Sequence, residues 1–178
     1  LHGHTSTIMS LTLLPDSNNL LSGSFDGSLR LWDVRTSRCI SVVRGYANTP
    51  TDIDWSPDSH QLVSGNIDAT VTIYDAGAGN LSQELREHIG VVIGVSWNSQ
   101  QSWVASSEWD NLIQVWDVKA GKSIRTLRHP DGEGIFLHGI AWSPDGASVE
   151  CATVSRGIHT FNMTTPLSTW TNHEAEQW

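Results

Sequence analysis

The stretch HTSTIMSLTLLPDSNNLLSGSFDGSLRLWD, residues 4–33, decides the fold of this chain. It opens on His4, carries Asp26 inside it and closes on the pair Trp32-Asp33. The same order returns along the chain at steps of 42, 42 and 41 residues. The residues that stand in the place of His4 are Tyr46, His88 and His129. An internal repeat of this length predicts similar units that stack side by side and share a continuous core.

Each unit holds four short segments that we expect to be strands. In the first unit they are residues 8–13, 19–23, 28–32 and 38–43. Turn signals such as Pro15-Asp16 separate them, and residues 28–32 alternate apolar and polar side chains as a half-buried strand does. No segment shows the period of an amphipathic helix over three turns. The sequence therefore predicts an all-β fold of four four-stranded antiparallel units.

The repeat also predicts how the chain is divided. One domain covers residues 1–178, with units at approximately 4–43, 46–85, 88–127 and 129–170. Residues 171–178 form a tail or the start of a further repeat. The fourth unit departs from the pattern, because Asp131-Gly132-Glu133-Gly134 is inserted and Phe161-Asn162 replaces the closing aromatic–aspartate pair. We expect its last strand at residues 167–170.

These units resemble the WD40 repeat family over nearly the whole chain. The resemblance rests on the Gly-His-like openings, the Ser-x-x-x-Asp spacing and the closing aromatic–aspartate pairs. It implies that the units are blades of a β-propeller, and that four of them are an arc of a larger propeller, since such rings usually close with about seven blades. Two copies that join into an eight-bladed ring, or a compact four-bladed ring, are the alternatives.

The resemblance further implies that a hydrogen-bonded tetrad of histidine, serine, aspartate and an aromatic residue holds each blade together. The positions are His4, Ser22, Asp26 and Trp32 in the first unit, Tyr46, Ser64, Asp68 and Tyr74 in the second, and His88, Ser106, Asp110 and Trp116 in the third. The fourth unit has Cys151, Ser155 and Phe161 at three of these places, so no tetrad is expected there. Catalytic sets occur once in a protein, whereas these residues recur, and we interpret them as structural. We predict no catalytic residue, no metal ligand and no cofactor.

A second set of positions is expected to contact a partner. In WD40 proteins these positions precede the tetrad aspartate or lie three and five residues after the tetrad histidine, on the narrow "top" face. On this chain the resemblance assigns Met9, Phe25, Thr51, Ile67, Val91, Ile93, Trp109, Phe136 and His138. Most are apolar, and a contiguous exposed apolar patch marks an interaction site, with an aromatic such as Trp109 as a typical hot spot. The alternative is that these side chains fold inward against neighbouring loops.

Composition limits the partners. The chain has a net charge of −9, with only ten lysines and arginines scattered along it. This argues against nucleic acid and against an anionic membrane surface, both of which attract clustered basic residues. No run of 18 apolar residues could cross a membrane. We expect Cys39 and Cys151 to be buried, reduced thiols of a cytoplasmic protein.

These observations favour a non-catalytic scaffold that presents its top face to a protein or peptide. The style of the repeats also resembles the WD40 sensor regions of signalling proteins, which implies such a context for the chain. Two other functions are open: a hydrolase-like propeller enzyme with a site near the central channel, and a purely architectural repeat domain.

Overall fold

The computed structural model describes residues 1–14, 18–43, 49–109, 111–128, 136–154, 157–163 and the backbone of 170–173. Within these residues the chain is all-β and contains no helix. Sixteen strands form four antiparallel sheets of four, and the strands of each sheet follow one another in chain order. The predicted fold class and the four-stranded units are confirmed.

Each sheet is one blade. Blade one contains β1 (Ile8–Leu13), β2 (Asn19–Ser24), β3 (Ser28–Asp33) and β4 (Arg38–Val43). Blade two contains β5 (Pro50–Trp55), β6 (Gln61–Asn66), β7 (Val71–Asp75) and β8 (Leu81–Leu85). Blade three contains β9 (Val92–Trp97), β10 (Trp103–Glu108), β11 (Leu112–Asp117) and β12 (Lys122–Arg128). Blade four contains β13 (Leu137–Trp142), β14 (Ser148–Thr153), β15 (Gly157–Asn162) and β16 (Trp170–His173).

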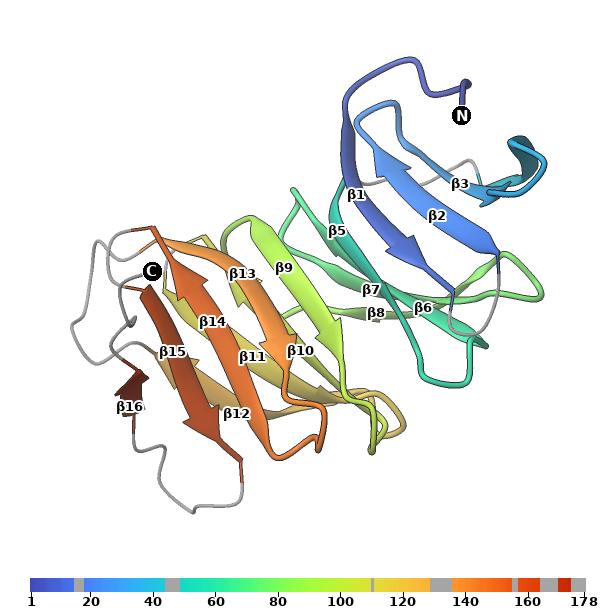
Figure 1. Ribbon diagram of the computed structural model, residues 1–178. Coiled ribbons are helices and arrows are strands. Elements are labelled where there is room, and N and C mark those ends of the chain that lie inside the picture. The colour runs from blue at the N-terminus through green and yellow to red at the C-terminus, as the bar shows by residue number, and fades with distance from the viewer. Residues whose placement is uncertain are drawn as a thin grey trace.

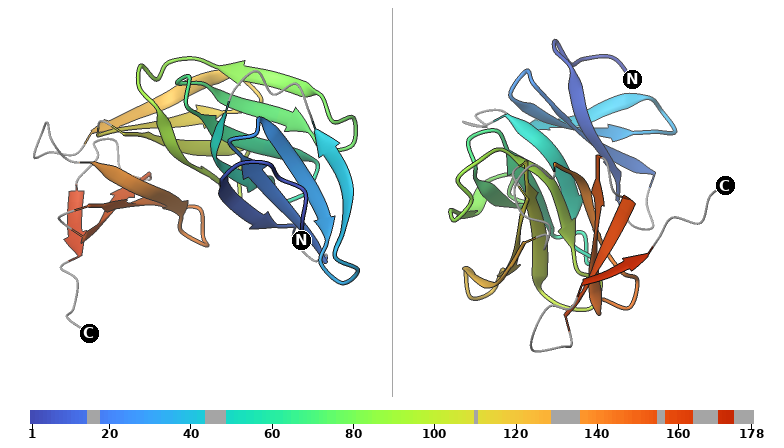
Figure 2. Two further views of the ribbon diagram at one scale, coloured as in Figure 1. Left: turned by 90° about the horizontal axis from the view of Figure 1, so that it is seen from above. Right: turned by 90° about the vertical axis from the view of Figure 1, so that its left-hand side faces the viewer.

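The blades follow one another along an arc (Figure 1). The first strand of each blade is the inner one, and β1 contacts β5, β5 contacts β9, and β9 contacts β13. Seen from above, blades one and four lie at opposite ends of the curve (Figure 2). This arrangement brings the loops at one end of all four blades around a shared inner surface.

The aspartate that closes each of the first three units shapes the turn after the third strand. Its Oδ1 accepts a hydrogen bond from the backbone N–H three residues later, at 2.8 Å for Asp33, 2.7 Å for Asp75 and 3.0 Å for Asp117. Such an aspartate-capped turn replaces a backbone hydrogen bond and fixes the direction of the returning strand. The same sequence feature that predicts the repeat therefore has a local physical role.

The hydrophobic core lies between the blades. Trp55, Trp97 and Trp142 end the inner strands β5, β9 and β13, and each is buried in a cluster with aliphatic residues of the preceding blade. Leu13 stands at the equivalent position of β1 and is 62% exposed. The difference arises because blade one has no described blade on that side.

The two end faces of the arc differ in polarity. On blade one, Ile8, Leu11 and Leu13 are 48%, 57% and 62% exposed. On the outward face of blade four, Glu150 and Thr160 stand at the repeat positions that Ala105 and Val115 occupy in blade three, where both are buried against blade four. Repeat arrays need a polar outer face on a terminal unit. The outward face of blade four presents Glu150 and Thr160 beside Ile158, which is 53% exposed, whereas blade one presents three aliphatic side chains.

Two sequence expectations are wrong in detail. Cys39 is exposed, because it lies on the outer strand β4 whose first four residues face solvent, whereas Cys151 is buried as expected. Burial raises the pKa of the Cys151 thiol to about 12. The last strand, β16, spans 170–173 rather than 167–170, since its pairing with β15 places Trp170 opposite Phe161. Residues 164–169 lie outside the described part of the chain.

Polar side chains of the inner strands also join neighbouring blades. The backbone N–H of Val95 donates to Oδ2 of Asp52 at 3.0 Å, and that of Trp97 donates to Oδ2 of Asp54 at 2.7 Å. These N–H groups lie on the edge of a sheet, where no further strand satisfies them. The two carboxylates of β5 therefore take the place of a neighbouring strand.

This arrangement makes Asp54 sensitive to pH. Burial raises the pKa of Asp54 to about 6, although hydrogen bonds from Trp97 and Trp55 oppose the shift, and the nearby charge of Asp52 adds to it. The folded state therefore holds the Asp54 proton more tightly than the unfolded chain does. The stability contributed by this proton is present below the ordinary carboxyl pKa and is lost as the pH rises through about 6.

We expect the pH dependence of stability to differ between the wild type and an Asp54→Asn variant. Between about pH 4 and about pH 7.5 the free energy of unfolding of the wild type should fall relative to the variant by about 1–3 kcal/mol. Denaturant unfolding of both proteins across this range measures the difference. A difference that stays constant with pH would contradict the assignment.

Candidate functional site

The top face is the end of the blades where the loop between the second and third strands meets the residue before the first strand. One backbone hydrogen bond recurs there in every blade. Phe25 donates to the carbonyl oxygen of Thr7 at 2.9 Å, Ile67 to that of Thr49 at 3.1 Å, Trp109 to that of Val91 at 3.0 Å, and Val154 to that of Phe136 at 3.1 Å. This bond holds the residue before the tetrad aspartate, or before Ser155 in the fourth blade, at the same place in each blade.

A β-bulge then positions a second top-face residue in each blade. The pairing of the first and second strands skips one residue of the inner strand, and the skipped residues are Met9, Thr51, Ile93 and His138. A bulge inserts an unpaired residue, bends the strand and redirects its side chain. All four belong to the predicted partner-contacting set. The bulge is the physical reason why the side chains at this position are directed differently from those of the adjacent residues in the strand.

These residues surround one pocket of about 530 Å³. Its lining consists of Met9, Phe25, Thr51, Asp52, Ile67, Val91, Ile93, Trp109, Leu137, His138 and Gly139. Eight of the nine partner-contacting positions predicted from sequence are among them. The ninth, Phe136, packs edge to face on Trp109 with 5.7 Å between the ring centroids. The structure thus brings the predicted set together from all four blades.

The apolar members of this set remain open to solvent. Met9 is 39% exposed, Phe25 44%, Ile67 44% and Trp109 54%. Thr51 is different, because its hydroxyl bonds the carbonyl oxygens of Gly65 and Val92 and so joins blade two to blade three. Most of the pocket wall is therefore available to a ligand, while Thr51 supports it.

Asp52, Leu137 and Gly139 are the lining residues that were not predicted, and Asp52 is the acidic one among them. It directly follows the bulge residue Thr51, and its carboxylate accepts hydrogen bonds from Ser10 Oγ at 2.7 Å and from the backbone of Ile53 at 2.9 Å. The sequence signal was the pair of aspartates inside a short strand, Asp52-Ile53-Asp54, which is unusual in a buried strand.

The tetrad of blade one is complete. Nδ1 of His4 donates to Oδ2 of Asp26 at 2.9 Å, and Nε2 of His4 lies 2.6 Å from Oγ of Ser22. Nε1 of Trp32 donates to the same Ser22 oxygen at 2.8 Å. Burial opposes ionisation of Asp26, but hydrogen bonds from Ser28, Thr5 and His4 outweigh it and hold the pKa of this carboxyl well below its ordinary value. The network fastens the chain start to β2 and β3.

Blade three builds the same network with a different carboxylate. Nε2 of His88 lies 2.6 Å from Oγ of Ser106, and Nε1 of Trp116 donates to that oxygen at 2.8 Å. Nδ1 of His88, however, donates to Oε2 of Glu108 at 3.0 Å, and the backbone N–H of Ile89 donates to the same oxygen at 3.1 Å. The expected partner, Asp110, lies outside the described residues.

The environment of His88 explains its charge state. Both His88 and Glu108 are almost fully buried. Burial lowers the pKa of His88, and the hydrogen bond and negative charge of Glu108 only partly offset this effect. The neutral imidazole can donate from Nδ1 and accept the Ser106 hydroxyl proton at Nε2, so each polar atom of the network has a partner.

In blade two, Asn66 is the centre of the hydrogen bonds that the structure describes at the tetrad positions. Tyr46 lies outside the described residues, and Ser64 donates to Oδ1 of Asn66 at 3.1 Å. Nδ2 of Asn66 in turn donates to the hydroxyl groups of Thr70 and Thr72. Asn66 holds the repeat position of Glu108, two residues before the predicted aspartate. The predicted Asp68 accepts a hydrogen bond from the Thr70 hydroxyl at 2.7 Å and closes the adjoining turn. Tyr74 packs at the edge of the core between blades one and two.

In the fourth blade, Cys151 and Phe161 hold two of the tetrad positions. Cys151 and Phe161 are buried in the core between blades three and four. His129 and Ser155 lie outside the described residues.

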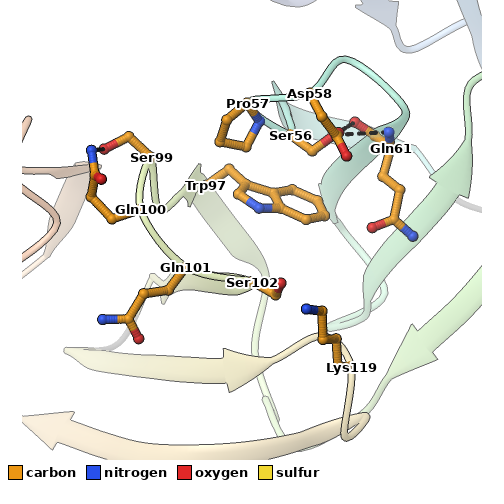
Figure 3. Close-up of a pocket in the computed structure, with 10 residues that line it drawn as sticks. All are labelled: Ser56, Pro57, Asp58, Gln61, Trp97, Ser99, Gln100, Gln101, Ser102 and Lys119. Atoms are coloured by element: carbon orange, nitrogen blue, oxygen red, sulfur yellow. Dashed lines mark hydrogen bonds between the residues drawn. The ribbon is translucent and has the colours of Figure 1, made fainter.

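A second pocket, of about 350 Å³, lies between blades two and three at the opposite end of the strands (Figure 3). The Trp97 ring lies between the turn after β5 and the turn after β9 (Figure 3). Oγ of Ser56 donates to Asp58 at 2.6 Å and accepts from the backbone N–H of Gln61 at 2.8 Å. Blade four repeats this turn chemistry with Ser143, Asp145 and Ser148. Its repetition identifies the polar lining as turn structure.

No group of three or more histidine, cysteine or acidic side chains that could hold a metal ion occurs among the described residues. In the same part of the chain no helix is long and apolar enough to cross a membrane.

We expect Glu108→Ala to destabilise the protein by about 2–4 kcal/mol, because it leaves His88 buried without its acceptor. Glu87→Ala is the matched control: this exposed glutamate neighbours His88 in sequence, and its loss should change the free energy of unfolding by less than about 0.5 kcal/mol. Denaturant unfolding measures both. A larger loss for Asp110→Ala than for Glu108→Ala would show that Asp110 is the tetrad carboxylate.

Two family models match the chain. Residues 1–33 match the model described as WD domain, G-beta repeat. Residues 46–165, two thirds of the chain, match the model described as Eukaryotic translation initiation factor eIF2A.

Curated relatives match single stretches. F-box/WD repeat-containing protein 10 of Mus musculus is 43% identical over 49 residues, which are 28% of this chain and 5% of the relative. Ribosome biogenesis protein BOP1 of Homo sapiens is 49% identical over 41 residues, 23% of this chain and 6% of the relative. Ribosome biogenesis protein YTM1 of Yarrowia lipolytica is 49% identical over 43 residues, which are 23% of this chain and 8% of the relative. The chain spans less than a tenth of the length of these relatives.

Proposed function

Because the chain belongs to the WD40 repeat proteins, and over residues 46–165 to the eIF2A family, we propose that it is a non-catalytic scaffold that binds a protein or peptide in its top-face pocket. The observation that carries this proposal is the pocket of about 530 Å³, to which all four blades contribute and in which large apolar side chains remain exposed. Patches of this kind mark interaction sites on soluble domains.

The anatomy of the pocket resembles that of a binding surface. Trp109 and Phe25 are large, amphipathic or aromatic side chains, the kind that dominate binding energy at interfaces. The backbone hydrogen bonds of Phe25 and Trp109 fix their loops before any partner arrives. A preformed site loses less conformational entropy on binding than a mobile one does.

The absence of catalysis is part of the proposal. The recurring histidine, serine and acidic residues are engaged in blade-holding networks, which leaves Asp52 and His138 as the titratable side chains that line the pocket. Among the described residues no hydrogen bond joins these two. A hydrolase-like enzyme is the alternative, and turnover of ester or phosphate substrates that a His138→Ala variant loses would favour it.

The cellular role proposed here is that of an adaptor in a cytoplasmic assembly. The relatives support this proposal, since one is named as an F-box/WD repeat-containing protein and two are named as ribosome biogenesis proteins. The resemblance to sensor regions remains the sole support for a signalling context.

A further blade is the partner that we propose for the exposed face of blade one. In blades two and three the equivalent face is buried by aliphatic side chains of the preceding blade. The outward face of blade four of a second copy would instead place Glu150 and Thr160, beside Ile158, against the apolar face of blade one, which leaves the Glu150 carboxylate facing Leu11 and Leu13. The larger propeller is therefore favoured over an eight-bladed ring of two copies.

We expect a Phe25→Ala, Trp109→Ala variant to keep its melting temperature within a few degrees, because both side chains are about half exposed. From the same cell extract, this variant should capture about tenfold less, or still less, of the proteins that the wild type captures. A Val34→Ala, Leu81→Ala variant removes exposed apolar side chains elsewhere and should capture them normally. Quantitative mass spectrometry compares the three; undiminished capture by the top-face variant would refute the proposal.

We expect this chain to form no closed ring of two copies. Light scattering after size exclusion should show a monomer, and a Leu11→Ser, Leu13→Ser variant should bind less of a dye that reports exposed apolar surface. A stable dimer that this variant dissolves would show that a second copy covers blade one.

A further inference from the structure

Building on the proposed function, we propose that the top-face pocket receives a lysine or arginine side chain of the partner, paired with the carboxylate of Asp52. The partner segment would carry this basic residue next to an aromatic or aliphatic one. The inference rests on how Asp52 is held, on the lack of a cation beside it, and on the apolar walls above it.

Three neighbouring strands hold the Asp52 carboxylate in place. Oδ1 accepts from Ser10 of β1 at 2.7 Å and from the backbone of Ile53 at 2.9 Å, and Oδ2 accepts from Val95 of β9 at 3.0 Å. A carboxylate has about four acceptor sites, so these bonds leave room for one more donor. The donor that fits is an N–H group that enters from the pocket.

The negative charge of Asp52 has no counter-ion in the described structure. No lysine or arginine lines the pocket, and within the described residues Asp52 forms no ion pair. Asp54, two residues further along β5, adds a second carboxylate on the same side of the strand. Burial raises the pKa of Asp52 against the opposing hydrogen bonds of Ser10, Val95 and Ile53. A cation in the pocket would offset this cost of burial.

The walls suit the stem of a long basic side chain. Lysine and arginine pack their methylene groups against apolar surface and keep the charged end at a polar site. Met9, Phe25 and Ile67 offer such a surface, and Trp109 adds an indole ring over which a cation is attracted. The volume of the pocket exceeds that of one side chain, which leaves space for an apolar neighbour.

Other ligand classes match the pocket less well. A purely apolar segment would cover the Asp52 carboxylate without giving it a counter-ion. An acidic segment would meet Asp52, Asp54 and a protein of net charge −9, with His138 as its only complementary group among the lining residues.

A displayed library of short random peptides tests the proposal. It is selected against the wild type, and the peptides enriched there should carry lysine or arginine next to an aromatic or aliphatic residue. Selection against Trp109→Ala should enrich none of these peptides, because the apolar wall is lost. This second selection tests the binding site itself, independently of the charge preference.

Matched peptides then isolate the ion pair. Calorimetry should show that replacing the basic residue by norleucine weakens binding to the wild type about tenfold or more, and has little effect on binding to Asp52→Asn. Asp58→Asn is the control, since it removes one carboxylate on the opposite face and should keep the preference. If Asp52→Asn does not fold, the salt dependence of binding provides the second measurement. Raising sodium chloride from about 0.05 M to about 0.5 M should weaken binding of the basic peptide to the wild type but should not weaken binding of its norleucine counterpart.

The outcomes separate the two proposals. Apolar peptides without a basic residue, whose binding depends on Trp109, would overturn the ion pair and leave the binding site standing. Enrichment of acidic peptides would overturn it in the same way. No enrichment on the wild type would refute both proposals.

Discussion

The packing of each sheet against the next is the interaction on which the rest of this protein depends. A four-stranded blade has two broad faces and cannot bury either of them by itself. Burial occurs where the inner strand of one blade meets the aliphatic row of its predecessor, as with Trp97 of β9 against blade two. Because burial of apolar surface is the main stabilising term, blades cohere as a row and not as separate units.

This constraint explains which features of the fold could be predicted from the sequence and which could not. Strands β1 and β4 have the predicted bounds, because turn signals in the sequence separate the strands of each unit. The order of strands and the all-β class follow from the same pattern. Cys39 was misjudged because periodicity does not distinguish an outer strand, which faces solvent, from an inner one.

The site was predictable to a different degree. The family resemblance assigned Met9, Ile67 and Trp109 to the partner-contacting set, and the structure places them at equivalent points because a bulge and one backbone hydrogen bond recur in every blade. It did not reveal Glu108, because only three-dimensional reach decides which of two nearby carboxylates contacts a buried histidine. Asp52 was missed for a related reason: its role depends on Ser10 and Val95, which lie in two other blades.

The unequal end faces give the row of blades a direction. A protein whose two end faces are apolar and complementary can form open-ended filaments, since each copy can bind head to tail to the next one. Here the aliphatic face of blade one would meet Glu150 on blade four of another copy. Burying this carboxylate against leucine without a cation is unfavourable, so head-to-tail association of copies is disfavoured. A single acidic side chain on the face of blade four therefore disfavours fibre formation by copies of a chain that exposes leucine on blade one.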